Sequence, residues 1–349
     1  MKGIIFRLGL YNYMDFRNWL VEEEETAISA GIDPIHTGKN FNNFFSNVSK
    51  GEFGKSNVGW QPSMDMGEHK PFHDEVSKHT GHFDDHIAKS IPTFREIQVK
   101  KGHAIVRAFG STDITMIDIG GGEGSLSKTI TSLSKGNIKT KVLDPNPNME
   151  SFYKSKSQVP GSHYDNRAFY RGWTDDDGTE VKALNADNTP DRYDVATETM
   201  VFQFMNNQRA THVREAKRLL KPGGLFIAEE KLKTNPEVWK DNEAFKDINH
   251  KNTYYSSDEL AAKEKIVGFQ QGKAQEKSIG MVDNMVTVEE FEAILLHNFR
   301  FVWQYWDSGN FKGYAASDNA MRVAAFVRAL GNTNSKYSRV SLPRKVERQ

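Results

Sequence analysis

The chain has 349 residues, no cysteine, and 46 basic side chains that balance 46 acidic ones. The lack of cysteine excludes disulfides, cysteine-ligated zinc and a cysteine nucleophile. A zero net charge gives no global basic field to hold the chain on DNA, and no apolar run is long enough to span a membrane. We therefore expect a cytoplasmic protein with neither DNA nor a membrane as partner.

Residues 1–80 differ in composition from the rest and are predicted to form a loop-rich N-terminal extension. A helix is expected over 14–30, and residues 31–71 are rich in Gly, Asn, Ser and Lys, which is typical of long loops. Five histidines follow beside acidic residues, and both types are good metal ligands. Their spacing matches no zinc motif, so we predict no metal site. The five are His69, His73, His79, His82 and His86.

Residues 81–330 are predicted to form one α/β domain, because strand and helix patterns alternate along them. Helices are expected over 83–109, with a break near Pro92, and a charged helical lid over 235–275. Residues 331–349 are basic and are predicted to form a surface or flexible tail. The remaining helices are expected at 125–133, 148–155, 208–220 and 288–298. The strands are expected at 114–119, 140–143, 193–197, 225–229, 299–305 and 321–329. A further strand is expected at or near 169–172 and 181–184.

The most informative stretch is Asp118-Ile119-Gly120-Gly121-Gly122-Glu123-Gly124, where the strand 114–119 ends. Glycines permit a sharp turn and the close approach of a ligand, and the helix that follows offers unpaired N–H groups. The spacing D-x-G-x-G-x-G differs from the dinucleotide fingerprint, and no phosphate-loop Gly-Lys-Ser/Thr follows. Asp144 ends the next strand, where an acid can bind both ribose hydroxyls. A nucleoside site is predicted; a NAD- or FAD-binding turn and a structural loop are the alternatives.

The glycine spacing resembles motif I of class I S-adenosylmethionine (SAM) methyltransferases. Within that superfamily, further segments are similar, in the same order, to the carboxy-SAM synthases, long described as tRNA uridine-5-oxyacetic acid methyltransferases. The resemblance covers roughly 82–318 and implies a Rossmann-like fold, with a seven-stranded, mostly parallel sheet and helices on both faces. The similar segments are 83–92, 202–204, 219–224, 229–231 and 283–287.

The resemblance also implies SAM as the cofactor and S-adenosylhomocysteine as its product. It implies that the motif I residues hold the methionine part of SAM and that an acid with its two flanking residues holds the ribose. A second acid lies near the adenine amino group, a threonine near the sulfonium, and an aromatic residue beside the ligand. The motif I residues are Asp118, Gly120, Gly122 and Gly124, and the ribose residues are Asp144, Pro145 and Asn146. The second acid is Asp187, the threonine is Thr199 and the aromatic residue is Phe94.

Two glutamates are predicted as catalytic residues. Methyl transfer from a sulfonium requires in-line alignment, and a base only where the acceptor must lose a proton. Glu198 follows the strand 193–197, and Glu229 ends the strand 225–229. The alternatives are a structural acid for Glu198 and ion pairing with Lys231 or Lys233 for Glu229. Thr197-Glu198-Thr199-Met200 stands where base-amino DNA methyltransferases have Asn/Asp-Pro-Pro-Tyr/Phe, which argues against that activity.

One departure from the carboxy-SAM synthases affects the expected reaction. Those enzymes hold the extra carboxylate of their cofactor with an arginine, whereas this chain has Lys277 there, which lacks the planar fork of arginine. We therefore predict methyl transfer from SAM to an unidentified small-molecule or tRNA-related acceptor. The alternatives are a carboxy-SAM synthase that uses prephenate and a non-catalytic SAM-binding subunit. A homodimer is possible on general grounds.

Overall fold

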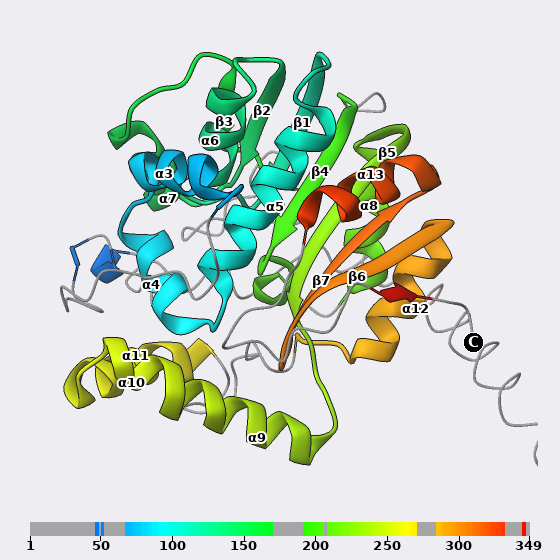
Figure 1. The fold of residues 1–349 in the computed structure, drawn as a ribbon. Helices are drawn as coiled ribbons and strands as arrows, with labels where there is room; N and C mark the ends of the chain where they lie inside the picture. Colours follow the sequence, from blue (N-terminus) through cyan, green and yellow to red (C-terminus); the bar gives the residue numbers. More distant parts are fainter. Residues whose placement is uncertain are drawn as a thin grey trace, which may run out of the picture.

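The computed structural model describes residues 46–48, 50–51, 67–169, 191–205, 208–270, 284–331 and 344–346. The helix expected over 14–30 and the segment 181–184 lie outside the described residues. Within the described part, one eight-stranded sheet has helices packed on both faces (Figure 1). No helix in this part of the chain is long and apolar enough to cross a membrane.

The sheet has the order β3-β2-β1-β4-β5-β7-β6-β8. Its first five strands in chain order pair in parallel, and β7 runs antiparallel to both β5 and β6. The chain builds outward from β1 to β3 and then restarts with β4 on the other side of β1, so a crevice opens at the carboxyl ends of β1 and β4. This topology confirms the Rossmann-like expectation. The strands are β1 (Ile114–Ile119), β2 (Ile138–Leu143), β3 (Ser162–Asp165), β4 (Tyr193–Thr199), β5 (Leu220–Lys231), β6 (Phe301–Ser308), β7 (Phe311–Ser317) and β8 (Arg344–Val346).

Two hydrophobic cores lie on opposite faces of the sheet, because successive side chains of a strand alternate in direction. In β1, Ile117 packs in one core and Met116 in the other. This burial on both faces explains why the strand is almost continuously apolar. The first core includes α8 (Arg209–Arg218) and α12 (Val288–Asn298); the second includes α3 (Lys70–His79), α5 (Phe94–Phe109), α6 (Ser125–Leu133) and α13 (Ala320–Leu330).

The segment predicted as a lid is helical in its described part and lies beyond the carboxyl ends of β4 and β5 (Figure 1). Asn235 begins it as an N-cap, with its side chain accepting from the amide of Glu237. The lid is fastened to α4 (His82–Ser90), because the Tyr255 hydroxyl lies 3.0 Å from Nδ1 of His86 and 3.1 Å from Oγ of Ser90. Its elements are α9 (Pro236–Lys246), the π-helical η3 (Asp247–Lys251), α10 (Asn252–Tyr254) and α11 (Ser257–Gln270).

The expectation of a strand over 321–329 is wrong, since these residues belong to α13. Val323, Phe326 and Leu330 are buried at the spacing of one helix face, and the Asn319 side chain caps the helix by accepting from the amide of Met321. The partner of β6 is instead β7, which the sequence pattern did not indicate. The expected seven strands become eight, because Arg344–Val346 of the predicted tail pairs with β6.

Candidate functional site

The loop between β1 and α6 has the backbone shape that its glycines permit. Gly120, Gly122 and Gly124 have φ angles of 62°, 53° and 73°, in the left-handed region. A Cβ on Gly120 would lie 2.3 Å from Cγ2 of Val201, and one on Gly124 would lie 2.6 Å from the Tyr153 ring. A Cβ on Gly122 would meet only ordinary contacts. Two of the glycines thus allow close packing, while Gly122 has room for a Cβ in ordinary contact with Met149 and Phe83.

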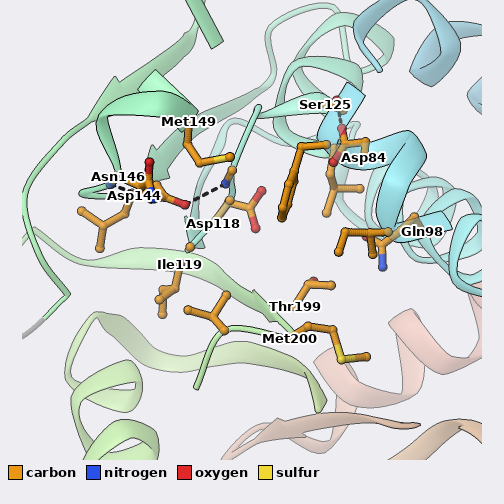
Figure 2. A pocket seen from close by; sticks show the side chains of 18 of the residues that line it. Asp84, Gln98, Asp118, Ile119, Ser125, Asp144, Asn146, Met149, Thr199 and Met200 are labelled. Atoms are coloured by element: carbon orange, nitrogen blue, oxygen red, sulfur yellow. Dashed lines mark hydrogen bonds between the residues drawn. The ribbon is translucent and has the colours of Figure 1, made fainter. Parts of the chain in front are cut away.

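A pocket lies at the carboxyl ends of β1, β2 and β4, beside the glycine loop and against α4 and α5. Figure 2 shows Asp144 and Asn146 on one side, Ser125 and Gln98 on the other, and Asp118 between them. The predicted site residues that line the pocket are Phe94, Asp118, Gly120, Gly122, Asp144, Pro145, Asn146 and Thr199. Gly124 lies outside the lining as the N-cap of α6, and Asp187 lies outside the described residues.

The Asp144 carboxylate is held at the end of β2 by main-chain amides. Its Oδ2 accepts from the amide of Gly122 at 3.2 Å, and its Oδ1 accepts from the amide of Asn146 at 2.9 Å. Burial raises the pKa of this carboxyl to about 6, although both amide bonds act to lower it. Asn146 in turn caps α7 (Pro147–Ser155). A carboxylate fixed in this way is suited to accept hydrogen bonds from a pair of hydroxyls.

Acidic groups outnumber basic ones on the pocket wall. Asp118 is fixed by the hydroxyls of Thr197 at 2.7 Å and Ser127 at 2.9 Å, and burial raises its pKa. Asp84 is hydrogen-bonded by the Ser125 hydroxyl, and burial raises its pKa as well. Together with Asp144 they make three carboxyl groups, whereas Arg95 is the only basic side chain among the described lining residues. Such a wall favours a cationic ligand over a phosphate.

Glu198 does not reach the pocket lining. Its side chain is fully buried, and its Oε1 accepts from the amide of Val201 at 2.6 Å. Burial and the neighbouring Glu230 raise its pKa well above the ordinary value. In this position Glu198 shapes the turn after β4. Its predicted catalytic role stays a prediction to which this placement gives no support.

Glu229 lies behind the pocket wall and anchors two residues that form it. Its Oε2 accepts from Gln98 Nε2 at 2.6 Å and from Lys101 Nζ at 2.8 Å. Lys101 also donates to the hydroxyl of Thr199 at 2.7 Å, and the Tyr305 hydroxyl donates to Oε1 of Glu229 at 2.6 Å. The observed ion-pair partner is therefore Lys101 on α5, rather than Lys231 or Lys233. Glu229 positions Gln98 and Thr199 from behind.

Two non-glycine residues with positive φ lie next to predicted site residues. Met200, with φ of 58°, directly follows Thr199 and lines the pocket, and Thr93, with φ of 61°, directly precedes Phe94. The indole N–H of Trp306 donates to the Thr93 hydroxyl at 3.0 Å. Such left-handed conformations cost free energy and gather at functional sites.

Three polar residues of α5 are absent from the sequence-based prediction of the site. Arg95 and Gln98 line the pocket, and Lys101 supports it. Gln98 and Lys101 could have been found from the sequence. They stand four and seven positions after Phe94, which is the spacing of one helix face. Asp84 also lines the pocket; it falls within the segment 83–92 that resembles the carboxy-SAM synthases but is not among the predicted site residues.

Comparison with solved structures returns methyltransferases at low identity. Human N-acetylserotonin methyltransferase, in complex with SAM, is 15% identical, with a TM-score of 0.37 over 71% of this chain and 65% of that one. A SAM-dependent methyltransferase from Aquifex aeolicus is 14% identical, with a TM-score of 0.37 over 65% of this chain and 94% of that one. An O-methyltransferase family protein from Burkholderia thailandensis is 11% identical, with a TM-score of 0.41 over 85% of this chain and 70% of that one. Likenesses this weak carry nothing about activity.

The family comparison is more informative. No curated protein matches the sequence. A family model described as a methyltransferase domain matches residues 93–270, which is half of the chain and includes the glycine loop and Asp144. The match agrees with SAM, the cofactor predicted from the sequence, and does not single out the carboxy-SAM synthases. The chain belongs to the methyltransferase domain family.

Proposed function

We propose that this chain transfers the methyl group of SAM to a small, largely apolar acceptor and releases S-adenosylhomocysteine. The observation that carries the proposal is the Asp144 carboxylate, held by the amides of Gly122 and Asn146 beside bare main chain. This arrangement supports binding of a ribose, since a vicinal diol supplies two donors to one carboxylate. Asp118 and the glycine loop would hold the methionine part of SAM.

The charge of the wall agrees with this ligand. A sulfonium carries a positive charge, and the lining supplies the carboxyl groups of Asp84, Asp118 and Asp144 against the single guanidinium of Arg95. The rest of the lining is mostly apolar, as suits a nucleobase and an apolar acceptor. The apolar side chains are Val76, Phe83, Ile87, Phe94, Ile119, Leu126, Leu143, Pro145, Met149, Phe169, Met200, Val201 and Met205.

The same charge balance favours a small molecule over a tRNA-related acceptor. RNA binding relies on basic side chains that neutralise phosphates. Among the described residues that line the pocket, Arg95 is the only candidate for that role, and Asp84 stands on the same wall. The lid lies beyond this same end of the sheet (Figure 1).

The residues of the chain contribute alignment. When bound, SAM supplies a methyl group that is already activated by the sulfonium, so the protein has chiefly to fix donor and acceptor in line. Gln98 and Thr199 are fixed on the wall by Glu229 and Lys101. We propose Glu229 as a positioning residue, which replaces the direct catalytic role predicted from the sequence.

The test is turnover of SAM by the purified full-length chain against a panel of small apolar nucleophiles and, separately, bulk tRNA. We expect S-adenosylhomocysteine to form only with a small acceptor, and Asp144→Ala to lower kcat/KM by at least about tenfold, or about 1.4 kcal/mol. Transfer only to tRNA would overturn the acceptor class. Carboxy-SAM formed from SAM and prephenate, or SAM binding without turnover on any acceptor, would overturn the reaction.

A further inference from the structure

Three potential metal ligands meet outside the pocket, where the turn before α3 packs on α5. Glu68, His69 and His103 each offer one ligand atom, and these atoms lie within 4.8 Å of one another. None of the three is among the described residues that line the pocket, and His103 lies five positions beyond Gln98, the last pocket-lining residue of α5, or about 8 Å along the helix. The cluster therefore has no part in the proposed methyl transfer.

Both histidines present a buried nitrogen without a hydrogen-bond partner. In the part of the chain that the structure describes, neither Nδ1 of His69 nor Nδ1 of His103 has a partner. The His69 side chain is only 6% exposed, and its ring meets that of His103 edge to face, with centroids 4.5 Å apart. A buried nitrogen left unpaired forfeits a hydrogen bond, so each one calls for an explanation.

The Nδ1 atom of His103 is available as a ligand atom. It is buried and has no hydrogen-bond partner among the described residues, so its lone pair can accept a metal ion in the tautomer that carries the proton on Nε2. Metal-binding histidines likewise place one ring nitrogen on the metal and keep the N–H on the other.

Glu68 supplies a charged ligand and an opening to solvent. Its Oε2 is bound by Arg107 at 2.6 Å, while its Oε1 lies 3.8 Å from Nε2 of His69. The side chain is 51% exposed, so an ion and a water molecule have access from the surface. The two oxygens thus have separate roles, because Arg107 can orient the carboxylate through Oε2 while Oε1 lies near His69.

We propose that Glu68, His69 and His103 bind one divalent transition-metal ion, with Zn²⁺ as the ion that fits best. Two imidazoles and one carboxylate are a donor set that zinc takes in proteins, with water as the fourth ligand. The bound ion joins the turn before α3 to α5. Its effect is on the stability of this helix packing.

The test uses the untagged full-length chain, freed of metal with a chelator and then titrated with ZnCl₂. We expect one equivalent of bound zinc by elemental analysis, and a rise in Tm of at least about 3 °C with zinc in excess. His69→Ala and His103→Ala should each weaken zinc binding at least about tenfold. His163→Ala removes an exposed histidine on β3 and should leave zinc binding unchanged.

A variant of an exposed ligand is needed as well, because variants of the buried histidines can fail to fold. Glu68→Gln removes the charge of an exposed side chain and should weaken zinc binding with an unchanged circular dichroism spectrum. Tetrahedral Co²⁺ absorption that is present in the wild type and lost in His103→Ala would support the same ligands. A folded wild-type chain that takes up no zinc, or zinc binding unchanged in all three ligand variants, would overturn the proposal.

Discussion

Nζ of Lys101 lies 2.8 Å from Oε2 of Glu229, and neither side chain is exposed to solvent. The pair joins α5 to β5, and through Tyr305 it reaches β6 as well. Desolvation largely offsets the attraction within a buried ion pair, but removal of one partner leaves a buried charge uncompensated. The pair therefore fixes the arrangement of the pocket wall more than it adds to stability.

Lys101→Met is expected to lower the free energy of unfolding by about 3–5 kcal/mol, because Glu229 loses its countercharge. The double variant Lys101→Met/Glu229→Gln should recover most of that loss. Urea denaturation measures both. Lys154→Met breaks an exposed ion pair with Glu150 and serves as the control with no measurable change. A Lys101→Met chain as stable as the wild type would contradict the role given to the pair.

Gly124→Ala is expected to lower mainly the stability of the protein, and Gly122→Ala mainly its affinity for SAM. Both residues have positive φ, which costs an L-residue about 1–2 kcal/mol. A Cβ at Gly124 also meets the Tyr153 ring at 2.6 Å, so this variant should lose the more stability. A Cβ at Gly122 stands on the pocket wall and should weaken SAM binding by at least about tenfold. Thermal denaturation and calorimetry separate the two effects, and unchanged SAM affinity in Gly122→Ala would show that the loop does not approach the ligand.

SAM affinity is expected to fall with acidification through pH 6. Burial raises the pKa of Asp144 from 3.8 to about 6, and the ribose hydroxyls require the charged carboxylate as acceptor. At pH 5 the affinity should be about tenfold lower than at pH 7.5. The free energy of unfolding changes in the opposite direction. Because the pKa of Asp144 is raised in the folded state, the contribution of this group to stability declines as pH rises from about 4 to about 6. Asp144→Asn should remove both dependences; a SAM affinity that is flat from pH 5 to 7.5 in the wild type would count against ribose binding at Asp144.

Glu123 is expected to destabilise the protein at alkaline pH. Burial and the nearby Asp84 raise its pKa to about 8. One oxygen accepts from the amide of Phe83 at 2.7 Å, and Oε2 has no hydrogen-bond partner among the described residues. Its contribution to stability therefore falls as pH rises from about 4.5 to about 8.

Glu123→Gln keeps the shape of this side chain without the charge. It should match the wild type at pH 5 and exceed its free energy of unfolding by more than about 1 kcal/mol at pH 9. Urea denaturation at the two pH values measures the difference. Equal stability of the two proteins at pH 9 would show that Glu123 is not a buried acid.

The sequence was sufficient to predict features that local chemistry dictates. Positive φ at the glycine loop favours glycine, and the acid that follows β2 could be predicted from the strand pattern. The start of α12 could equally be predicted from the sequence, since Thr287 and Glu290 form a capping box. The segment 321–329 was misassigned because its apolar residues are dense enough to read as a strand. Helix spacing of Val323, Phe326 and Leu330 was the better guide.

The partners of the two glutamates were beyond the reach of local pattern. Thr199 lines the pocket, so its neighbour Glu198 points to the other face of the sheet, as alternation along a strand requires. The contact of Glu229 with Gln98 and Lys101 joins positions more than a hundred residues apart, and no spacing rule along the chain predicts it. The placement of the glycine loop and Asp144 at adjacent strand ends was therefore predictable, whereas the network that supports the pocket wall was not.

Calorimetric titration of the folded full-length chain with SAM and with S-adenosylhomocysteine tests the central claim most directly. The account predicts one site for each ligand, and loss of both titrations in an Asp144→Ala variant whose circular dichroism spectrum matches the wild type. Absence of heat with either ligand in the folded wild type, or undiminished binding in Asp144→Ala, would contradict it.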